Sequence, residues 1–321
     1  MDLSNMIVKR LSLEPSLAWK LVVNVLGTDP ESADAKQAAA TTRDAPLVAT
    51  LLSERDAQGN IPHPAYKKWN GAHWVLSILA DLGYPPGDES LRPMMEQCYA
   101  AWLSKAHEKY IRTIQGRVRR CASQEGNAIW YSLRLGLADA RTQQLAERLV
   151  KWQWSDGGWN CDKNPEASIS SFMETLIPLR ALGLYAKASG DPRAQRSAER
   201  AAEIFLKRRL FKRQRDGAVM DQHFVLLHYP PYWHYDILFA LKVMAETGFV
   251  IDPRCSDALD LLESKRLPDG GFPTEESHSR TTRPELSGYS LVNWGGKSKI
   301  HMNPFVTADA LHVLRASGRE K

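Results

Sequence analysis

The sequence predicts an all-α fold of the α/α toroid type, in which an inner ring of helices lies inside an outer ring. The first observation is a turn at Gly157 between two stretches of helical character, where glycine allows a positive φ angle at no steric cost. Gln153 precedes this glycine and Trp159 follows it. The same spacing recurs, and its copies lie around Gly59, Gly126, Gly217 and Gly270. Such recurrence is typical of a helical repeat.

A second kind of joint ends one helix and begins the next. In each copy a glycine stops a helix, and an aspartate with a following proline starts another, which is the usual chemistry of a C-cap and an N-cap. The copies are Gly27 with Asp29 and Pro30, Gly190 with Asp191 and Pro192, and Gly248 with Asp252 and Pro253. Because the two kinds of joint alternate, the chain is predicted to run between outer and inner helices as one domain over residues 1–321.

The alternation assigns apolar stretches to an inner ring and more polar stretches to an outer ring. The inner helices are predicted at residues 15–26, 66–82, 127–138, 168–186, 233–247 and 304–316. The outer helices are predicted at residues 32–53, 91–107, 140–152, 192–212 and 252–265. Pro178 should kink or restart its helix, because proline lacks an amide hydrogen. Residues 106–120 stay unassigned, and residues 274–302 are predicted to form a long loop.

The turn motifs resemble those of a known family. Gln153, Gly157 and Trp159 are spaced as in the Gln-Trp motif of squalene-hopene and oxidosqualene cyclases. Residues 268–272, Pro-Asp-Gly-Gly-Phe, resemble the equivalent turn of protein prenyltransferase β subunits. The resemblance covers most of the chain through its repeats. It implies the α/α toroid of the terpenoid cyclase and protein prenyltransferase superfamily, a fold that supports several chemistries.

Composition is that of an ordinary globular protein. Of the 321 residues, 43% are hydrophobic and 25% are charged, and no apolar run is long enough to span a bilayer. The first six residues lack the basic and apolar regions of a secretion signal, and the four cysteines form no Cys-x-x-Cys pair. We therefore expect a cytoplasmic protein. The net charge of +5 is densest at residues 207–215, which we expect to be a solvated helix end and not a nucleic-acid surface.

The predicted turns should bring chemistry-bearing residues together. If each glycine turn delivers the start of an inner helix to the same end of the ring, the residues after the turns face one another around a mouth. Aromatic walls suit an apolar small molecule, although tryptophans in a helical array also serve as core residues. The predicted substrate-binding residues are Trp69, Asn70, His73, Trp130, Tyr131, Trp233, Tyr235, Trp294 and Asn303.

Four residues are candidates for catalysis. Asp236 precedes an apolar helix, so burial should raise the pKa of its carboxyl and let it donate a proton, unless it caps that helix or pairs with a cation. Glu174 is the second candidate acid, within another inner helix. His234 and His301 are predicted to orient or reprotonate the acid, with an ordinary surface or core histidine as the alternative.

The motifs that carry the family's chemistry are incomplete in this chain. The cyclases protonate their substrate with an Asp-x-Asp-Asp motif, which is absent here. The prenyltransferases hold zinc with Asp, Cys and His, but no cysteine accompanies Asp236, and Val306-Thr307 stands where the family's His-Thr would be. The spacing of His223, His228 and His234 also matches no metal motif. We therefore expect no bound metal and no cofactor.

Three functions remain open from the sequence. The first is binding, cyclisation or isomerisation of an isoprenoid or similar apolar substrate, by general acid catalysis in a central aromatic-lined cavity. The second is a glycan lyase or hydrolase. The third is a non-catalytic toroid that binds an apolar ligand or a protein. A deep apolar pocket would favour the first, an open groove with stacked tryptophans and carboxylates the second, and a centre filled with side chains the third.

Overall fold

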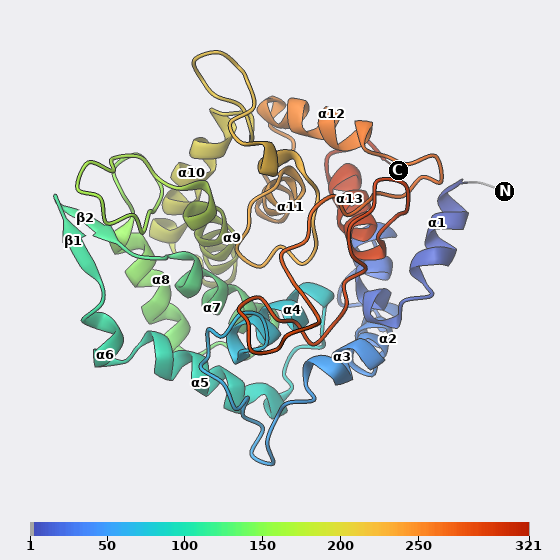
Figure 1. Ribbon diagram of the computed structural model, residues 1–321, viewed down its shortest axis with the longest axis horizontal. Helices are drawn as coiled ribbons and strands as arrows, with labels where there is room; N and C mark the ends of the chain where they lie inside the picture. The colour runs from blue at the N-terminus through green and yellow to red at the C-terminus, as the bar shows by residue number, and fades with distance from the viewer. Residues whose placement is uncertain (1–2, 321) are drawn as a thin grey trace.

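The helices form a ring around a packed centre (Figure 1). The computed structural model describes residues 3–320, so Met1 and Asp2, part of the segment examined for a secretion signal, lie outside the described residues. Within the described chain, sheet is confined to one two-stranded hairpin. The predicted all-α toroid is therefore confirmed. No helix among residues 3–320 has both the length and the apolar character that crossing a membrane requires.

The ring has inner elements and outer helices. The inner elements are the π-helix η2 (Lys20–Val25), α4 (Ala72–Leu82), α7 (Ser123–Arg134), α9 (Phe172–Ser189), α11 (Ile237–Thr247) and α13 (Pro304–Ala316). The outer helices are α2 (Ala33–Arg43), α3 (Pro46–Leu51), α5 (Arg92–Trp102), α8 (Ala140–Trp152), α10 (Pro192–Leu206) and α12 (Ser256–Ser264). The remaining elements are α1 (Leu3–Leu11), α6 (Lys105–Glu108), β1 (Arg112–Ile114), β2 (Arg117–Arg119) and short 3-10 helices at Pro15–Leu17, Glu89–Leu91, Gln222–Val225 and Pro253–Cys255.

Each inner element contacts its neighbour around the ring and an outer helix behind it. In order, α4 packs on α7, α7 on α9, α9 on α11, α11 on α13, and α13 on η2. The ring closes between η2 and α4, where Lys20 Nζ and Asp81 Oδ2 form a buried ion pair at 2.6 Å. Outside, α5 covers α4, α8 covers α7, α10 covers α9, α12 covers α11, and α2 covers η2. Because the inner helices are covered on both sides, their sequences are apolar nearly all round.

The turn at Gly157 has the geometry that its sequence predicts. Its φ angle is 109°. The Gln153 side-chain amide donates to the carbonyl oxygens of Gly157 and Ser197, both at 2.8 Å, and so ties the turn to α10. In the later copy, the Arg266 guanidinium donates to the carbonyl of Gly270 at 3.4 Å. A long polar side chain before the glycine therefore closes both turns, and positive φ angles are also found at Gly59, Gly217 and Gly270.

Gly126 departs from the prediction, because it lies inside α7 and not in a turn. A Cβ atom at this position would lie 3.0 Å from Ile177 Cγ2 and from the backbone nitrogen of Pro178, both in α9. The glycine therefore allows a close approach of the two helices. Because α7 begins at Ser123, earlier than predicted, Trp130 lies in the middle of the helix and not in its first turn.

Other helix boundaries also differ from the prediction. Residues 15–26 form a 3-10 turn followed by a π-helix, and residues 32–53 divide into α2 and α3, the second of which begins at Pro46. The regular helices of residues 66–82 and 233–247 begin only at Ala72 and Ile237. The restart expected at Pro178 does not occur, since α9 continues through it. As predicted, left-handed glycines end α9 and α11, at Gly190 and Gly248.

The segments without a regular pattern take defined positions. Residues 112–119 form the hairpin, whose Val118 carbonyl accepts a hydrogen bond of 2.8 Å from the indole of Trp154. The segment between α12 and α13 crosses one face of the ring near α4 (Figure 1). There the backbone amide of Trp69 donates to the Tyr289 carbonyl at 2.7 Å, and its indole donates to the His278 carbonyl at 2.8 Å. This covering segment, residues 274–303, therefore lies over the predicted mouth.

Candidate active site

The starts of the inner helices meet at one end of the ring, as the glycine turns predict. We call this end the mouth. Residues far apart in sequence are in contact there because the turns deliver them to the same side. The contacts are those of Glu174 in α9 with Ser123 in α7, of Trp69 before α4 with His234 before α11, and of Tyr229 before α11 with Phe305 in α13.

Most of the predicted substrate-binding residues are buried in the wall of the ring. Trp69, for example, stacks on Tyr232 with ring centroids 3.9 Å apart, so neither presents an open face there. Trp233 is half-buried and keeps accessible surface. The other predicted residues are at most 5% exposed: Trp69, Asn70, His73, Trp130, Tyr131, Tyr235, Trp294 and Asn303.

Charged side chains fill the ring axis, where the sequence predicted an aromatic-lined cavity. Lys20 and Lys242 each bind Asp81 and Asp309, with N–O distances of 2.6–3.0 Å. Because buried charges must be paired, this network holds the inner helices together and excludes a ligand from the axis. We call it the axial network; its members are Lys20, Asp81, Arg180, Lys242, Glu246 and Asp309.

A cavity of about 220 Å³ lies at the opposite end of the ring, where the inner helices finish. Arg134, Lys187 and His312 line it together with members of the axial network. Trp130 also faces this cavity, beneath Arg180, whose guanidinium carbon lies 3.5 Å from the ring centroid. Its charged lining makes the cavity polar, so it is not the deep apolar pocket that an isoprenoid needs. Trp130 therefore lies away from the other residues predicted to form the mouth.

Asp236 is fully buried and engaged by its own surroundings. It is the N-cap of α11, and its Oδ1 accepts a hydrogen bond of 2.7 Å from the backbone amide of Phe239. Its Oδ2 accepts a bond of 2.9 Å from the His228 amide and lies 2.7 Å from the Nδ1 of the same residue. The structure thus places Asp236 in the capping and pairing positions that the sequence left open as the alternative to proton donation.

Glu174 occupies a different environment at the mouth. Ser171 and Glu174 have the spacing of a capping box, in which the glutamate side chain would accept a bond from the Ser171 amide. Here that amide donates to the Trp159 carbonyl, at 2.9 Å. Glu174 Oε2 instead accepts a bond of 3.0 Å from the Ser123 amide in α7, and its Oε1 lies 3.7 Å from Cys161 Sγ. Burial raises the pKa of the Glu174 carboxyl. Its neutral form therefore persists to higher pH than that of an exposed glutamate.

Lys68 supplies a cation to the mouth. Its ammonium lies 4.7 Å from the ring centroid of Trp233 and 5.4 Å from that of Trp69. Burial lowers the pKa of Lys68, and the neighbouring Cys121 acts in the opposite direction. Within residues 3–320, Lys68 forms no ion pair with a carboxylate, whereas the lysines of the axial network are bound to two each.

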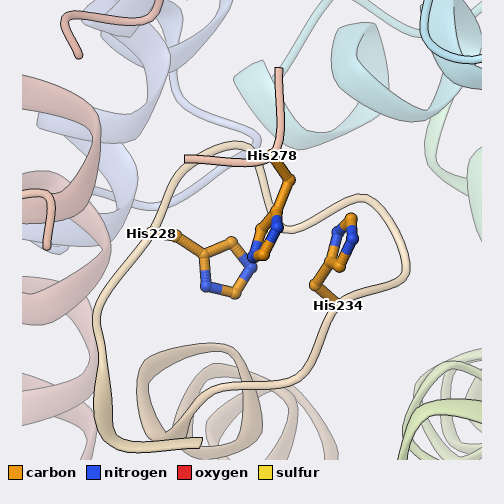
Figure 2. A group of neighbouring side chains, drawn as sticks. All are labelled: His228, His234 and His278. Carbon is orange, nitrogen blue, oxygen red and sulfur yellow. The ribbon is translucent and has the colours of Figure 1, made fainter. Parts of the chain in front are cut away.

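Among residues 3–320, two groups of side chains bring metal-capable atoms within 4.8 Å of one another: Cys121, Cys161 and Glu174, and His228, His234 and His278. In the first group the Glu174 oxygens already contact Ser123 and Cys161. In the second group, shown in Figure 2, the buried His228 Nε2 and His234 Nδ1 have no hydrogen-bond partner. Burial lowers the pKa of His234 to about 2 and that of His278 to about 4, so both imidazoles are neutral at neutral pH.

The two histidines predicted for catalysis have different positions. His234 belongs to the histidine group at the mouth. His301 is exposed on the covering segment, where its backbone amide donates to Ser298 Oγ at 2.9 Å. Among the described residues, no hydrogen bond or ion pair joins the His301 side chain to Asp236 or Glu174, which it was predicted to assist.

Sequence reasoning missed the axial network, Lys68, His278 and the neighbouring thiols of Cys121 and Cys161. The network has a sequence signal, because Lys242 and Asp309 are charged residues within otherwise apolar helices. Lys68 and His278 have no such signal, since they lie in irregular segments that only the fold brings to the mouth. The thiols of Cys121 and Cys161 meet because Arg119 and Asn160, which precede them closely in sequence, form a parallel bridge.

Comparison with known proteins found no family model and no curated protein that matches the chain. Among solved structures, a UGL variant with dGlcA-Glc-Rha-Glc is 13% identical with a TM-score of 0.44, and covers 94% of this chain and 84% of its own. A protein from Actinoplanes is 17% identical with a TM-score of 0.45, over 98% and 99% of the two chains. The type II terpene cyclase MstE from Scytonema is 17% identical with a TM-score of 0.29, over 85% and 96%. These structures assign no activity to this chain.

Proposed function

We propose that the protein is an enzyme of the acid–base type, in which Glu174 donates a proton to a substrate held at the mouth beside Lys68. The position of the Glu174 carboxyl supports this best, because it is largely buried between the start of α7 and the Cys161 thiol. The nearby Arg120 is bound to Glu125, at 2.9 Å, and not to Glu174. A carboxyl without a cationic partner in a desolvated place retains its proton and can donate it.

Asp236 is less suited to this role. Its two oxygens already accept bonds from the amides of Phe239 and His228 and contact the His228 ring. Both oxygens are therefore already occupied by donors of the protein itself. We therefore assign proton donation to Glu174, with Asp236 as a residue that caps α11 and positions His228.

Lys68 favours one class of substrate. Its ammonium occupies the faces of Trp69 and Trp233, where cation–π attraction would otherwise stabilise a carbocation. A second positive charge would be repelled there, whereas a substrate that carries or develops negative charge would be attracted. We therefore favour an acidic carbohydrate or a similar oxygen-rich anion over an isoprenoid. The filled axis is compatible with this assignment, because the reaction takes place at the mouth.

The reaction that fits these groups is an elimination. The C–O bond to a leaving group breaks as the leaving oxygen takes the proton from Glu174, and a C–C double bond forms as the adjacent carbon loses its proton. Water carries that proton away and returns one to Glu174, so that the acid is restored. Lys68 stabilises the negative charge that develops on the substrate before the bond breaks.

The test begins with a substrate screen of acidic oligosaccharides and linear isoprenoids, read by the absorbance of new double bonds and by mass spectrometry. With any substrate found, Glu174→Gln should lower kcat by about 10²–10⁴-fold, because the amide has the carboxyl's size but no acidic proton. Glu166→Gln, a change at an exposed glutamate in the loop before α9, should leave kcat unchanged. Normal turnover by the folded Glu174→Gln protein would exclude the assignment.

Lys68 variants distinguish the two substrate classes. For an anionic transition state, Lys68→Met should lower kcat/KM and Lys68→Arg should retain most of it, because only the second keeps the charge. For a carbocation, Lys68→Met should instead preserve or raise the rate. That second result, with isoprenoid products, would replace the elimination by the cyclisation or isomerisation considered from the sequence.

A further inference from the structure

The histidine group at the mouth is not used by the proposed acid–base reaction. His228 and His234 lie in the loop before α11, and His278 comes from the covering segment (Figure 2). We propose that these three histidines bind one zinc ion, in an open site that leaves a fourth position for water or a ligand. Three imidazoles with a free fourth position are a ligand set that zinc accepts.

Orphaned nitrogens carry the proposal. The His228 side chain is about 1% exposed, and its Nε2 has no hydrogen-bond partner. His234 Nδ1 is likewise buried and without a partner. Buried polar atoms are almost always satisfied in folded proteins, so two orphaned ring nitrogens in one group indicate a missing partner. A metal ion that accepts lone pairs from both would satisfy them together.

The ring geometry is close to what an ion requires. One nitrogen of each ring lies within 4.8 Å of the other two. The His234 and His278 rings are parallel, with centroids 3.5 Å apart and an interplanar angle of 6°. Zinc–nitrogen bonds of about 2.0–2.1 Å in a tetrahedral site separate the nitrogens by roughly 3.4 Å. Because an imidazole lone pair lies in the plane of its ring, the His234 and His278 rings must turn out of their parallel arrangement to bind one ion with His228.

Carboxylates stand behind two of the three rings. Asp236 Oδ2 lies 2.7 Å from His228 Nδ1, which leaves Nε2 as the ligand atom. Glu276 Oε2 lies 3.7 Å from His278 Nε2. Carboxylates in this position orient metal-bound histidines and raise their basicity. Asp236 and Glu276 also place two carboxylates beside the group, and their negative charge would attract a dication.

This inference replaces the expectation of no metal, which rested on the incomplete prenyltransferase triad and on the spacing of His223, His228, His234 and Asp236. His278 completes the group from a distant segment, and no spacing rule would have included it. The inference does not depend on the proposed acid–base reaction, because it concerns metal binding by three residues that the reaction does not use.

The experiment uses the purified full chain, stripped with a chelator and titrated with Zn²⁺ by calorimetry. We expect one zinc per chain. Replacement by Co²⁺ should give the intense visible bands of a tetrahedral site with nitrogen ligands. A wild-type protein that takes up no stoichiometric zinc would overturn the proposal, whatever the result of the Glu174 test.

Single variants locate the ion. His278→Ala and His234→Ala should each weaken zinc binding by at least about 100-fold, since loss of a ligand exceeds the 10–100-fold typical of residues behind the ligands. Asp236→Asn, which can still cap α11, should weaken it by about 10–100-fold. His301→Ala removes an exposed histidine of the same covering segment and should bind zinc as the wild type does. Wild-type affinity in folded His278→Ala protein would contradict the site.

Discussion

The axis and the mouth of the ring use ionisable groups in opposite ways. In the axial network three cations and three anions are joined by ion pairs of 2.5–3.4 Å. At the mouth, Lys68 has no carboxylate partner among the described residues, Glu174 has no bound cation, and buried ring nitrogens of His228 and His234 have no hydrogen-bond partner. Fully paired charges stabilise one arrangement, whereas unpaired groups remain able to bind or transfer protons. The paired charges at the axis therefore stabilise the fold, and the mouth is where we propose that the reaction takes place.

The largest expected effect is a loss of stability when one member of the axial network is replaced. Asp81 accepts hydrogen bonds from Lys20 and Lys242, both at 2.6 Å, and from Tyr229 at 3.0 Å. Asp81→Asn would leave buried cations short of a partner, so we expect the free energy of unfolding to fall by about 3–5 kcal/mol. Urea unfolding measures this change. Glu203→Gln, which breaks the half-exposed pair with Arg254, should cost less than about 1 kcal/mol.

The same network gives a pH dependence with a definite sign. The lysines Lys20 and Lys242 and Arg180 hold the pKa of Asp81 well below its usual value, against the opposing effect of burial. A depressed pKa contributes stability above the unfolded value of about 3.9, and this stability is lost as pH falls through the folded pKa. The stability difference between wild type and Asp81→Asn should therefore shrink in acid. A difference that stays constant from pH 7 to pH 3 would contradict this account of the axis.

A smaller loss of stability should follow from a substitution in the turn at Gly157, which leads to α9 and the mouth. Gly157 has a φ angle of 109°, and a Cβ atom there would lie 2.6 Å from the Arg200 carbonyl oxygen. Gly157→Val should therefore lower the free energy of unfolding by at least the roughly 1–3 kcal/mol of a strained backbone. Gly190 has a φ of 73°, and a Cβ atom there would have no heavy atom within 4 Å. Gly190→Val therefore introduces backbone strain without a clash and should lower the free energy of unfolding by less. Equal thermal unfolding temperatures for both variants would exclude a role for the clash.

Much of the fold can be predicted from the sequence because its joints are local. Glycine turns and Asp-Pro starts are decided by backbone chemistry within a few residues, and Gly157, Gly190 and Gly248 adopt the predicted conformations. Gly126 is different, since it serves a helix contact with Ile177 that no local pattern reveals. Because the glycine spacing predicts a turn at Gly126, it places the start of α7 too late in the sequence. Trp130 is therefore predicted in the first turn of the helix, whereas it lies in the middle.

The site was less predictable because it depends on contacts between distant segments. Asp236 and Glu174 both precede or begin apolar helices, and the sequence alone does not show that Glu174 accepts a bond from the Ser123 amide, 51 residues away. The amide that binds Asp236 belongs to His228, in an irregular loop whose path has no periodic signal. Lys68 and His278 lie in irregular segments, so no periodicity marks them. Only the closed ring shows which carboxyl is engaged by donors and which remains free to hold a proton.

The protonation of Glu174 tests most directly the claim that the mouth is the chemical end of the ring. Carbon-13 NMR of protein labelled at glutamate side chains, with Glu174→Gln to identify the resonance, measures the pKa of this carboxyl during a pH titration. Because burial outweighs the amide of Ser123 and the charge of Arg120, the pKa should lie above the ordinary value of 4.5. A pKa at or below that value in the folded protein would contradict the assignment of Glu174 as the proton donor.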